Sequence, residues 1–220
     1  MTRTTNARIA GFTYLFYIAV AFPSMVLFGR AASGKGTAAK LASIVQHASD
    51  VRVAVVLALL GCFSALVLAV TLYGITRDED HELAMLALAC RVGEGVLGAA
   101  SLPKMLGLLG LATAAAGAGA TDAAAANALG GFLLTPSGTG ASFFAVGSTL
   151  FSWLLLRGRM VPVALAWLGV LASVLLVVAL PLELAGFLKL NWYLWMPMLV
   201  FEVVLGLWLL IKGVVAQRAR

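Results

Sequence analysis

Charged side chains are scarce in this sequence: they make up 11% of its 220 residues, whereas hydrophobic residues make up 62%. A soluble domain carries about 25% charged residues. A chain of this size cannot hide so many apolar side chains inside a water-soluble globule, because too few polar residues remain to cover the surface. The composition therefore predicts an integral membrane protein.

Histidine and cysteine are rare as well, with two of each. His47 and His81 fall outside the long apolar stretches, which argues against a histidine metal centre or a Ser–His pair within the membrane. Those stretches contain no Asp, and the chain has no HExxH and no P-loop motif. Cys62 and Cys90 lie in apolar sequence, where thiols pack as small side chains. We expect no enzyme activity, no catalytic residue, no metal site and no cofactor.

The formal net charge is +6, but no run of basic residues interleaved with aromatic ones is present. The basic residues instead lie near the ends of the apolar stretches, as in the orientation signal of membrane proteins. Eight of them fall on flanks that share a side with the N-terminus and five on the opposite flanks. We therefore expect both termini in the cytoplasm. The expected partner is the lipid bilayer of a bacterial inner membrane or plasma membrane, not nucleic acid; protein partners stay open.

Transmembrane helices need about 17–25 mostly apolar residues. By that rule the sequence predicts an all-α bundle with six spans, in a single integral-membrane domain over residues 1–220. The expected spans are about 9–28, 51–75, 83–116 with a break at 103, 140–156, 161–180 and 192–214.

The third predicted span is too long for one straight perpendicular crossing. Its 34 residues, 83–116, would extend about 50 Å at 1.5 Å per residue. Pro103 interrupts it. Either the helix kinks at Pro103 and projects past the membrane, or residues 105–116 form a separate half-helix.

Two connecting segments carry further signals. Residues 37–48 place Leu41, Ile44 and Val45 at helical spacing, which predicts a short amphipathic helix at the membrane interface. Residues 117–139 are rich in Ala, Gly and Thr, and we expect a flexible outer loop with at most one short helix.

Arg91 and Glu94 lie in the middle of the third span. A charge at this depth costs about 2.5–3.5 kcal/mol unless it is paired or hydrated. Three residues apart on a helix, the two side chains are neighbours on one face and can neutralise each other. Glu202 lies near the centre of the sixth span.

Small residues accompany these charges on both helices, which is typical of faces that contact other helices. We expect the two faces to meet, so that Arg91 is flanked by Glu94 and Glu202. Fully ionised, this cluster carries a charge of −1, and one carboxylate can then take up a proton. Possible contributors to the site are Ser101, Lys104, Ser148 and Ser152.

Several interpretations of this cluster remain open. It can be a structural ion pair that fixes helix register, or a site that binds a small polar molecule or a lipid headgroup, or one that switches protonation. A small secondary transporter or channel is an alternative. A structural or regulatory membrane subunit without substrate is another.

Four segments together resemble a known family. They are Ala7-Arg8-Ile9-Ala10-Gly11-Phe12, Arg91-x-x-Glu94, Leu155-Leu156-Arg157-Gly158-Arg159-Met160-Val161-Pro162, and Phe201-Glu202 followed by Leu207-Trp208-Leu209-Leu210-Ile211-Lys212-Gly213. The ordered set resembles a bacterial integral-membrane family known as domain of unknown function number 4386. The resemblance implies a six-helix membrane protein with no assigned activity. In that family the fourth span often begins with a His, where this chain has Ser142-Phe143-Phe144.

Overall fold

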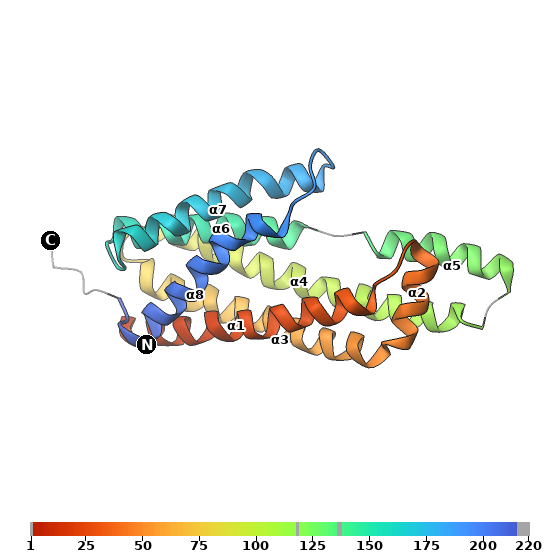
Figure 1. Cartoon of the computed structure of the whole chain (residues 1–220). Helices are drawn as coiled ribbons and strands as arrows, with labels where there is room; N and C mark the ends of the chain where they lie inside the picture. The colour runs from red at the N-terminus through yellow and green to blue at the C-terminus, as the bar shows by residue number, and fades with distance from the viewer. Residues whose placement is uncertain (1, 118, 136–137, 215–220) are drawn as a thin grey trace. The chain divides into compact units, whose positions relative to one another are not determined.

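The computed structural model of the chain describes residues 2–117, 119–135 and 138–214 (Figure 1). The described residues form eight α-helices and one 3-10 helix, η1, and no strand, which confirms the all-α prediction. The elements are α1 (Arg3–Ala31), α2 (Thr37–Gln46), α3 (Ala48–Thr76), α4 (His81–Ala115), α5 (Ala120–Leu133), α6 (Thr139–Arg157), α7 (Val163–Leu184), η1 (Trp192–Trp195) and α8 (Met196–Ile211).

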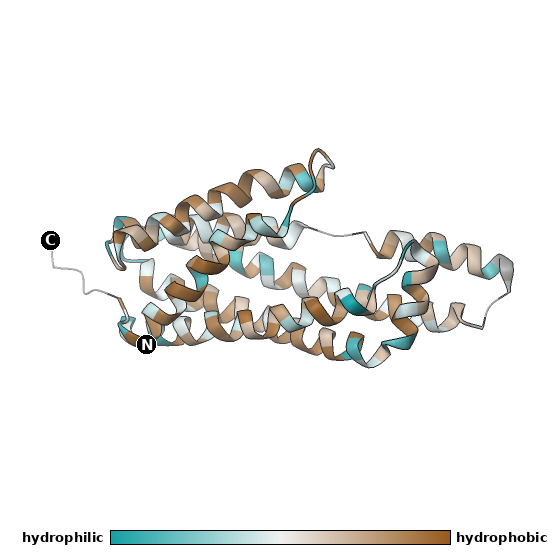
Figure 2. Ribbon diagram, viewed as in Figure 1, coloured by the Kyte–Doolittle hydropathy of each residue, from teal (hydrophilic) through white to brown (hydrophobic). Residues whose placement is uncertain are grey.

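Within the described residues, six helical segments are long and apolar enough to cross a membrane. They are α1, α3, α4, α6, α7 and the continuous pair of η1 and α8, which begins at Trp192 and ends at Ile211. Figure 2 shows these ribbons mostly in hydrophobic colours, with many of the hydrophilic residues near helix ends and turns. The six spans agree with the predicted ones within a few residues, except that α1 begins at Arg3 instead of near Ile9.

Helix α4 is continuous over 35 residues, with Pro103 inside it. The predicted break at residue 103 is absent, and residues 105–116 are not a separate half-helix. A proline in a helix removes one backbone hydrogen bond and crowds the preceding turn. The remaining hydrogen bonds and the packing of Leu102, Leu108 and Leu109, all of them buried, compensate for that local loss.

The predicted outer loop is mostly helical. Helix α5 occupies 14 of its residues, so the expectation of a flexible loop with a short helix was wrong in extent. The sequence contains the run Ala123-Ala124-Ala125-Ala126, and Ala has the highest helix propensity of all residues. Helix α2 forms where amphipathic spacing predicted it, and its buried residues are Leu41 and Ile44. A side-chain carbon on Gly130 of α5 would lie 3.1 Å from Leu41, so α2 packs closely on α5.

The chain divides into two compact units, which we describe separately. Unit 1 contains the described residues within Met1–Tyr17, Cys62–Leu97 and Gly138–Arg220. Unit 2 contains Ile18–Gly61 and the described residues within Gly98–Ser137. Helices α1, α3 and α4 contribute to both units, and each unit has its own buried apolar cluster.

In unit 1 the beginning of α1 packs tightly against the end of α8 (Figure 1). A side-chain carbon on Gly11 would lie 2.6 Å from the carbonyl oxygen of Gly206 and would also clash with the backbone of Leu210. The two helix ends that carry the termini therefore lie at the same end of this unit, as an even number of spans requires. Their location in the cytoplasm stays a prediction.

Large apolar side chains remain exposed on every spanning helix. Examples from unit 1 are Phe12, 60% exposed, Phe63, 57% exposed, and Leu171, 63% exposed. A water-soluble surface would not carry so many, whereas lipid tails cover them at no cost. The exposed residues and the apolar helix lengths together describe a multi-pass membrane protein.

Candidate functional site

The centre of the candidate site is a buried ion pair on α4. Arg91 has no exposed surface and Glu94 is 8% exposed. Nη1 of Arg91 lies 2.9 Å from Oε2 of Glu94. The pairing that the three-residue spacing predicted is present, and it places both charges inside the helix bundle of unit 1.

Tyr17 of α1 gives Glu94 a second partner. Its hydroxyl donates a hydrogen bond of 3.0 Å to Oε1 of Glu94. The carboxylate thus receives the guanidinium on one oxygen and a phenol on the other. A hydrogen bond to an ionised group is about twice as strong as one between neutral groups, so Tyr17 fixes the orientation of Glu94.

Helix α6 encloses the other side of Arg91. The carbon Cζ of Arg91 lies 5.0 Å from the ring centre of Phe144, within the range of a cation–π contact. Gly147 follows one turn later, and a side-chain carbon there would lie 3.0 Å from Cγ of Arg91. The missing side chain of Gly147 makes room for the aliphatic stem of Arg91.

Glu202 of α8 is also buried, at 6% exposure. It interacts electrostatically with both Arg91 and Glu94. Among the residues that the structure describes, however, it forms no ion pair with Arg91, and its Oε1 has no hydrogen-bond partner. We predicted that Glu94 and Glu202 both flank Arg91. In the structure Glu94 is in direct contact with Arg91, whereas Glu202 interacts with it at longer range.

The face of α8 that carries Glu202 also contacts α1. A side-chain carbon on Gly206, one turn beyond Glu202, would lie 3.1 Å from Cβ of Tyr14. Tyr14 is 2% exposed and interacts electrostatically with Arg91, Glu94 and Glu202. We predicted that one face of α4 and one face of α8 form this group of residues. In the structure α1 also contributes, through Tyr14 and Tyr17.

Several buried polar atoms of unit 1 have no hydrogen-bond partner among the described residues. Nε and Nη2 of Arg91 are two of these atoms, and Oε1 of Glu202 and Oγ of Ser148 are two more. A buried donor or acceptor without a partner costs about 1–3 kcal/mol. The four atoms include two donors, one acceptor and one hydroxyl that can act as either. We call Arg91, Glu94, Glu202 and Ser148 the polar cluster.

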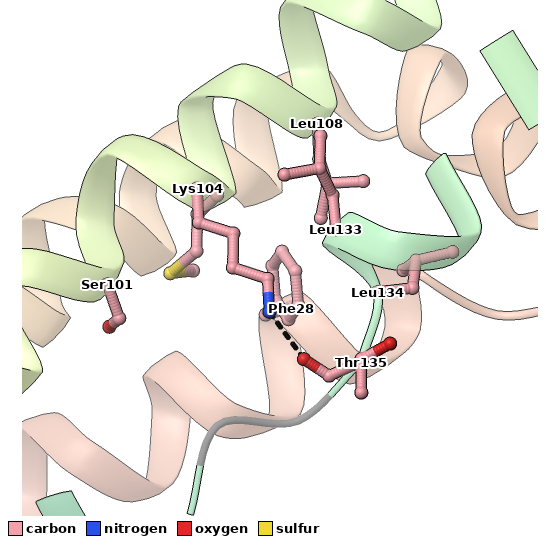
Figure 3. Close-up of a pocket in the computed structure, with 8 residues that line it drawn as sticks. Phe28, Ser101, Lys104, Leu108, Leu133, Leu134 and Thr135 are labelled. Atoms are coloured by element: carbon pink, nitrogen blue, oxygen red, sulfur yellow. Dashed lines mark hydrogen bonds between the residues drawn. The ribbon is translucent and has the colours of Figure 1, made fainter. Parts of the chain in front are cut away.

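The four predicted contributors separate into two groups. Ser148 and Ser152 are buried in unit 1, at 3% and 1% exposure. A side-chain carbon on Gly169 of α7 would lie 2.6 Å from Oγ of Ser152, so Ser152 packs against α7. Ser101 and Lys104 belong to unit 2, where they line a different cavity (Figure 3).

The depth of the ion pair follows from helix geometry. Arg91 lies ten residues after His81, the first residue of α4, which is about 15 Å along the axis at 1.5 Å per residue. Half of the hydrocarbon core of a bilayer is also about 15 Å. If α4 enters the membrane near its first turn, Arg91 lies near the bilayer centre, where an unpaired charge is most costly.

The acidic turn before α4 has structural partners. Oδ1 of Asp80 accepts a hydrogen bond of 3.1 Å from the backbone N–H of Leu83, which caps the helix. Arg157 at the end of α6 lies 3.0 Å from Asp80 and 3.3 Å from Glu79. In the part of the chain that the structure describes, no three His, Cys, Asp or Glu side chains are placed to hold a metal ion.

Sequence reasoning missed Tyr17, Phe144 and Gly147. One signal for Tyr17 was present, since Tyr14 and Tyr17 are three residues apart within an apolar stretch and their hydroxyls need polar partners. Phe144 and Gly147 carry no such signal, because an aromatic and a small residue are ordinary in any span.

The sequence model of one family, "Domain of unknown function (DUF4386)", matches residues 9–213. No curated protein and no solved structure is significantly similar to the chain. The matched region includes all the residues of the polar cluster and all six spans except the first residues of α1. The chain therefore belongs to the DUF4386 family, as the four sequence segments indicated.

Proposed function

We propose that this membrane protein binds a small polar molecule at the polar cluster of unit 1. One observation carries the proposal: within the described part of the chain, Arg91 Nε and Nη2, Ser148 Oγ and Glu202 Oε1 are buried without hydrogen-bond partners. Leaving four such atoms unpaired would cost several kcal/mol, more than half of a marginal protein's stability. An occupant that bonds to them removes this penalty.

The chemistry of the four atoms describes the occupant. It needs acceptor atoms for the guanidinium of Arg91 and a donor for the carboxylate of Glu202. A zwitterion, a polyhydroxylated molecule or a lipid headgroup with both kinds of atom satisfies these requirements. Ordered water would satisfy the same atoms without a ligand, and that case corresponds to a purified protein with no additional bound mass.

A second candidate is a change of protonation at Glu202. With both carboxylates ionised the cluster carries a charge of −1, and Glu202 has no ion-pair partner while Glu94 has one. Burial of an unpaired carboxylate is expensive, so this group can exchange a proton when the bundle rearranges. The charged groups that interact electrostatically with it are Arg91 and Glu94, and the hydroxyls of Tyr14 and Tyr17 also interact with it.

We propose further that the protein binds this molecule without catalysing a reaction, and that it resides in a bacterial inner membrane. A secondary transporter or channel is the main rival, and a regulatory subunit without substrate is the other.

Cysteine labelling tests the transporter alternative, which requires a water path to the polar cluster. Ser148→Cys and Ser152→Cys keep the side-chain size, and they are introduced into a background where Cys62 and Cys90 are replaced by Ala. A transporter predicts that a membrane-impermeant thiol reagent labels these positions, whereas a sealed binding site does not.

Native mass spectrometry of the protein purified in mild detergent tests the proposal. We expect an additional bound mass that is lost in Arg91→Gln and retained in Arg77→Gln, whose exposed side chain lies 3.7 Å from the carboxylate of its neighbour Asp78. Ser148→Ala should weaken binding without removing a charge. A bare protein of unchanged mass, in which Arg91→Gln is only less stable, would instead support a structural ion pair.

A further inference from the structure

Unit 2 contains a cavity of about 250 Å³ that is separate from the polar cluster (Figure 3). Its lining is mostly apolar and comes from α1, α4 and the end of α5. Among the described residues that line it, Lys104 is the only charged one. The cavity residues are Phe28, Ser101, Lys104, Met105, Leu108, Leu133, Leu134 and Thr135.

Lys104 has no anionic partner. Its Nζ donates a hydrogen bond to the backbone carbonyl oxygen of Thr135, a neutral acceptor (Figure 3). No carboxylate of the described residues lies within ion-pair distance of it. An ammonium carries three donors, so two N–H groups remain for a further ligand. The positive charge at this cavity is therefore uncompensated and favours an anion.

We propose that this cavity binds a single-chain amphiphile with an anionic head, with the head at Lys104 and the alkyl chain along Leu108, Leu133 and Phe28. The volume of about 250 Å³ gives room for one alkyl chain beside the ammonium group. This proposal is independent of the one for the polar cluster, since no residue of the polar cluster lines this cavity.

Photo-crosslinking in nanodiscs of a neutral lipid tests the proposal. The probe is a dodecanoate with a diazirine at the end of its chain, and peptide mass spectrometry locates the crosslinks. We expect crosslinks at Leu108, Leu133 and Leu134, above those at lipid-exposed Leu171. Unlabelled dodecanoate should compete for these crosslinks, while dodecanol and acetate should not, because each lacks one of the two features that the cavity recognises.

Variants separate the charge from the fold. Lys104→Gln should reduce crosslinking at least fivefold and Lys104→Arg should retain it, while Lys35→Gln, an exposed lysine of the same unit, should change nothing. Each of three results would overturn the proposal: crosslinking that follows side-chain exposure alone, equal competition by dodecanol, or an equal loss in Lys35→Gln. Competition by acetate alone would mean that the site recognises a free anion, which also contradicts it.

Discussion

At the scale of single residues, Arg91 is a fully buried charge in unit 1. Its guanidinium has no exposed surface, one ion pair with Glu94 and one ring contact with Phe144. Removing one partner of a buried pair leaves the other charge uncompensated. Substitutions in this group should therefore have effects far larger than those at exposed charges.

Arg91→Gln should destabilise the protein by about 3–5 kcal/mol, the range for breaking a buried pair from one side. Intrinsic tryptophan fluorescence during thermal unfolding in detergent measures the change. Glu94→Gln introduced together with Arg91→Gln should recover part of the loss, because the carboxylate of Glu94 is then no longer left without its partner. Arg77→Gln is the matched control, since exposed ion pairs contribute only about 0–1 kcal/mol. Equal thermal shifts in Arg91→Gln and Arg77→Gln would contradict this account.

Gly147→Ala should displace Arg91, because the added carbon would lie 3.0 Å from its Cγ and 3.2 Å from its Cδ. Overpacking of this kind costs about 1–3 kcal/mol. Gly107→Ala is the control, since nothing lies within 4 Å of an added carbon there and alanine favours a helix by about 1 kcal/mol. We expect a lower unfolding temperature and weaker retention of the bound molecule in the first variant only. A Gly147→Ala protein as stable as wild type would mean that the stem of Arg91 is free to move.

At the scale of helices, the small residues of α1 and α8 decide how closely these two helices approach. Gly11 and Gly206 face each other, and a side chain on either would meet backbone atoms of the opposite helix. Helices in lipid associate largely through such close packing, since the bilayer supplies no hydrophobic force between them. This contact also brings the α8 face of Glu202 toward Tyr14.

Gly11→Ala should therefore destabilise the protein by about 1–3 kcal/mol through a backbone clash that no side-chain rotation relieves. Gly29→Ala, on the same helix but with nothing within 4 Å, should be neutral or slightly stabilising. Thermal unfolding of the two variants side by side provides the measurement. If Gly29→Ala were the more harmful change, the α1–α8 contact described here would be incorrect.

At the scale of the whole molecule, the distribution of basic residues sets the orientation in the membrane. Arg3 donates a hydrogen bond of 2.8 Å to the carbonyl oxygen of Ile75 and contacts Met160, so the beginning of α1, the end of α3 and the turn after α6 meet at one end of unit 1. The same end carries Arg77 and Arg157. This concentration of basic residues is the pattern of a cytoplasmic surface.

We expect a reporter protein that fluoresces only in the cytoplasm to be fluorescent when fused to either terminus. A cysteine introduced at Lys35, in the turn after α1, should react with an impermeant thiol reagent in cells whose outer membrane has been permeabilised. Arg159→Cys, in the turn after α6, is the control and should stay unlabelled. The reverse labelling pattern would show that the orientation is inverted.

The sequence by itself determined the class of molecule, the six spans and the Arg91–Glu94 pair. Composition and span length fix the first two because a bilayer demands long apolar helices, and the pair follows from the three-residue spacing on one helix. The tertiary structure alone decided that Tyr17 orients Glu94 and that Gly147 makes room for Arg91. It also decided that Oε1 of Glu202 has no hydrogen-bond partner among the described residues, and that Lys104 lines another cavity. These facts depend on which helices approach one another and at what rotation. In lipid, that arrangement comes from close packing of small and aromatic side chains, which no local sequence period records.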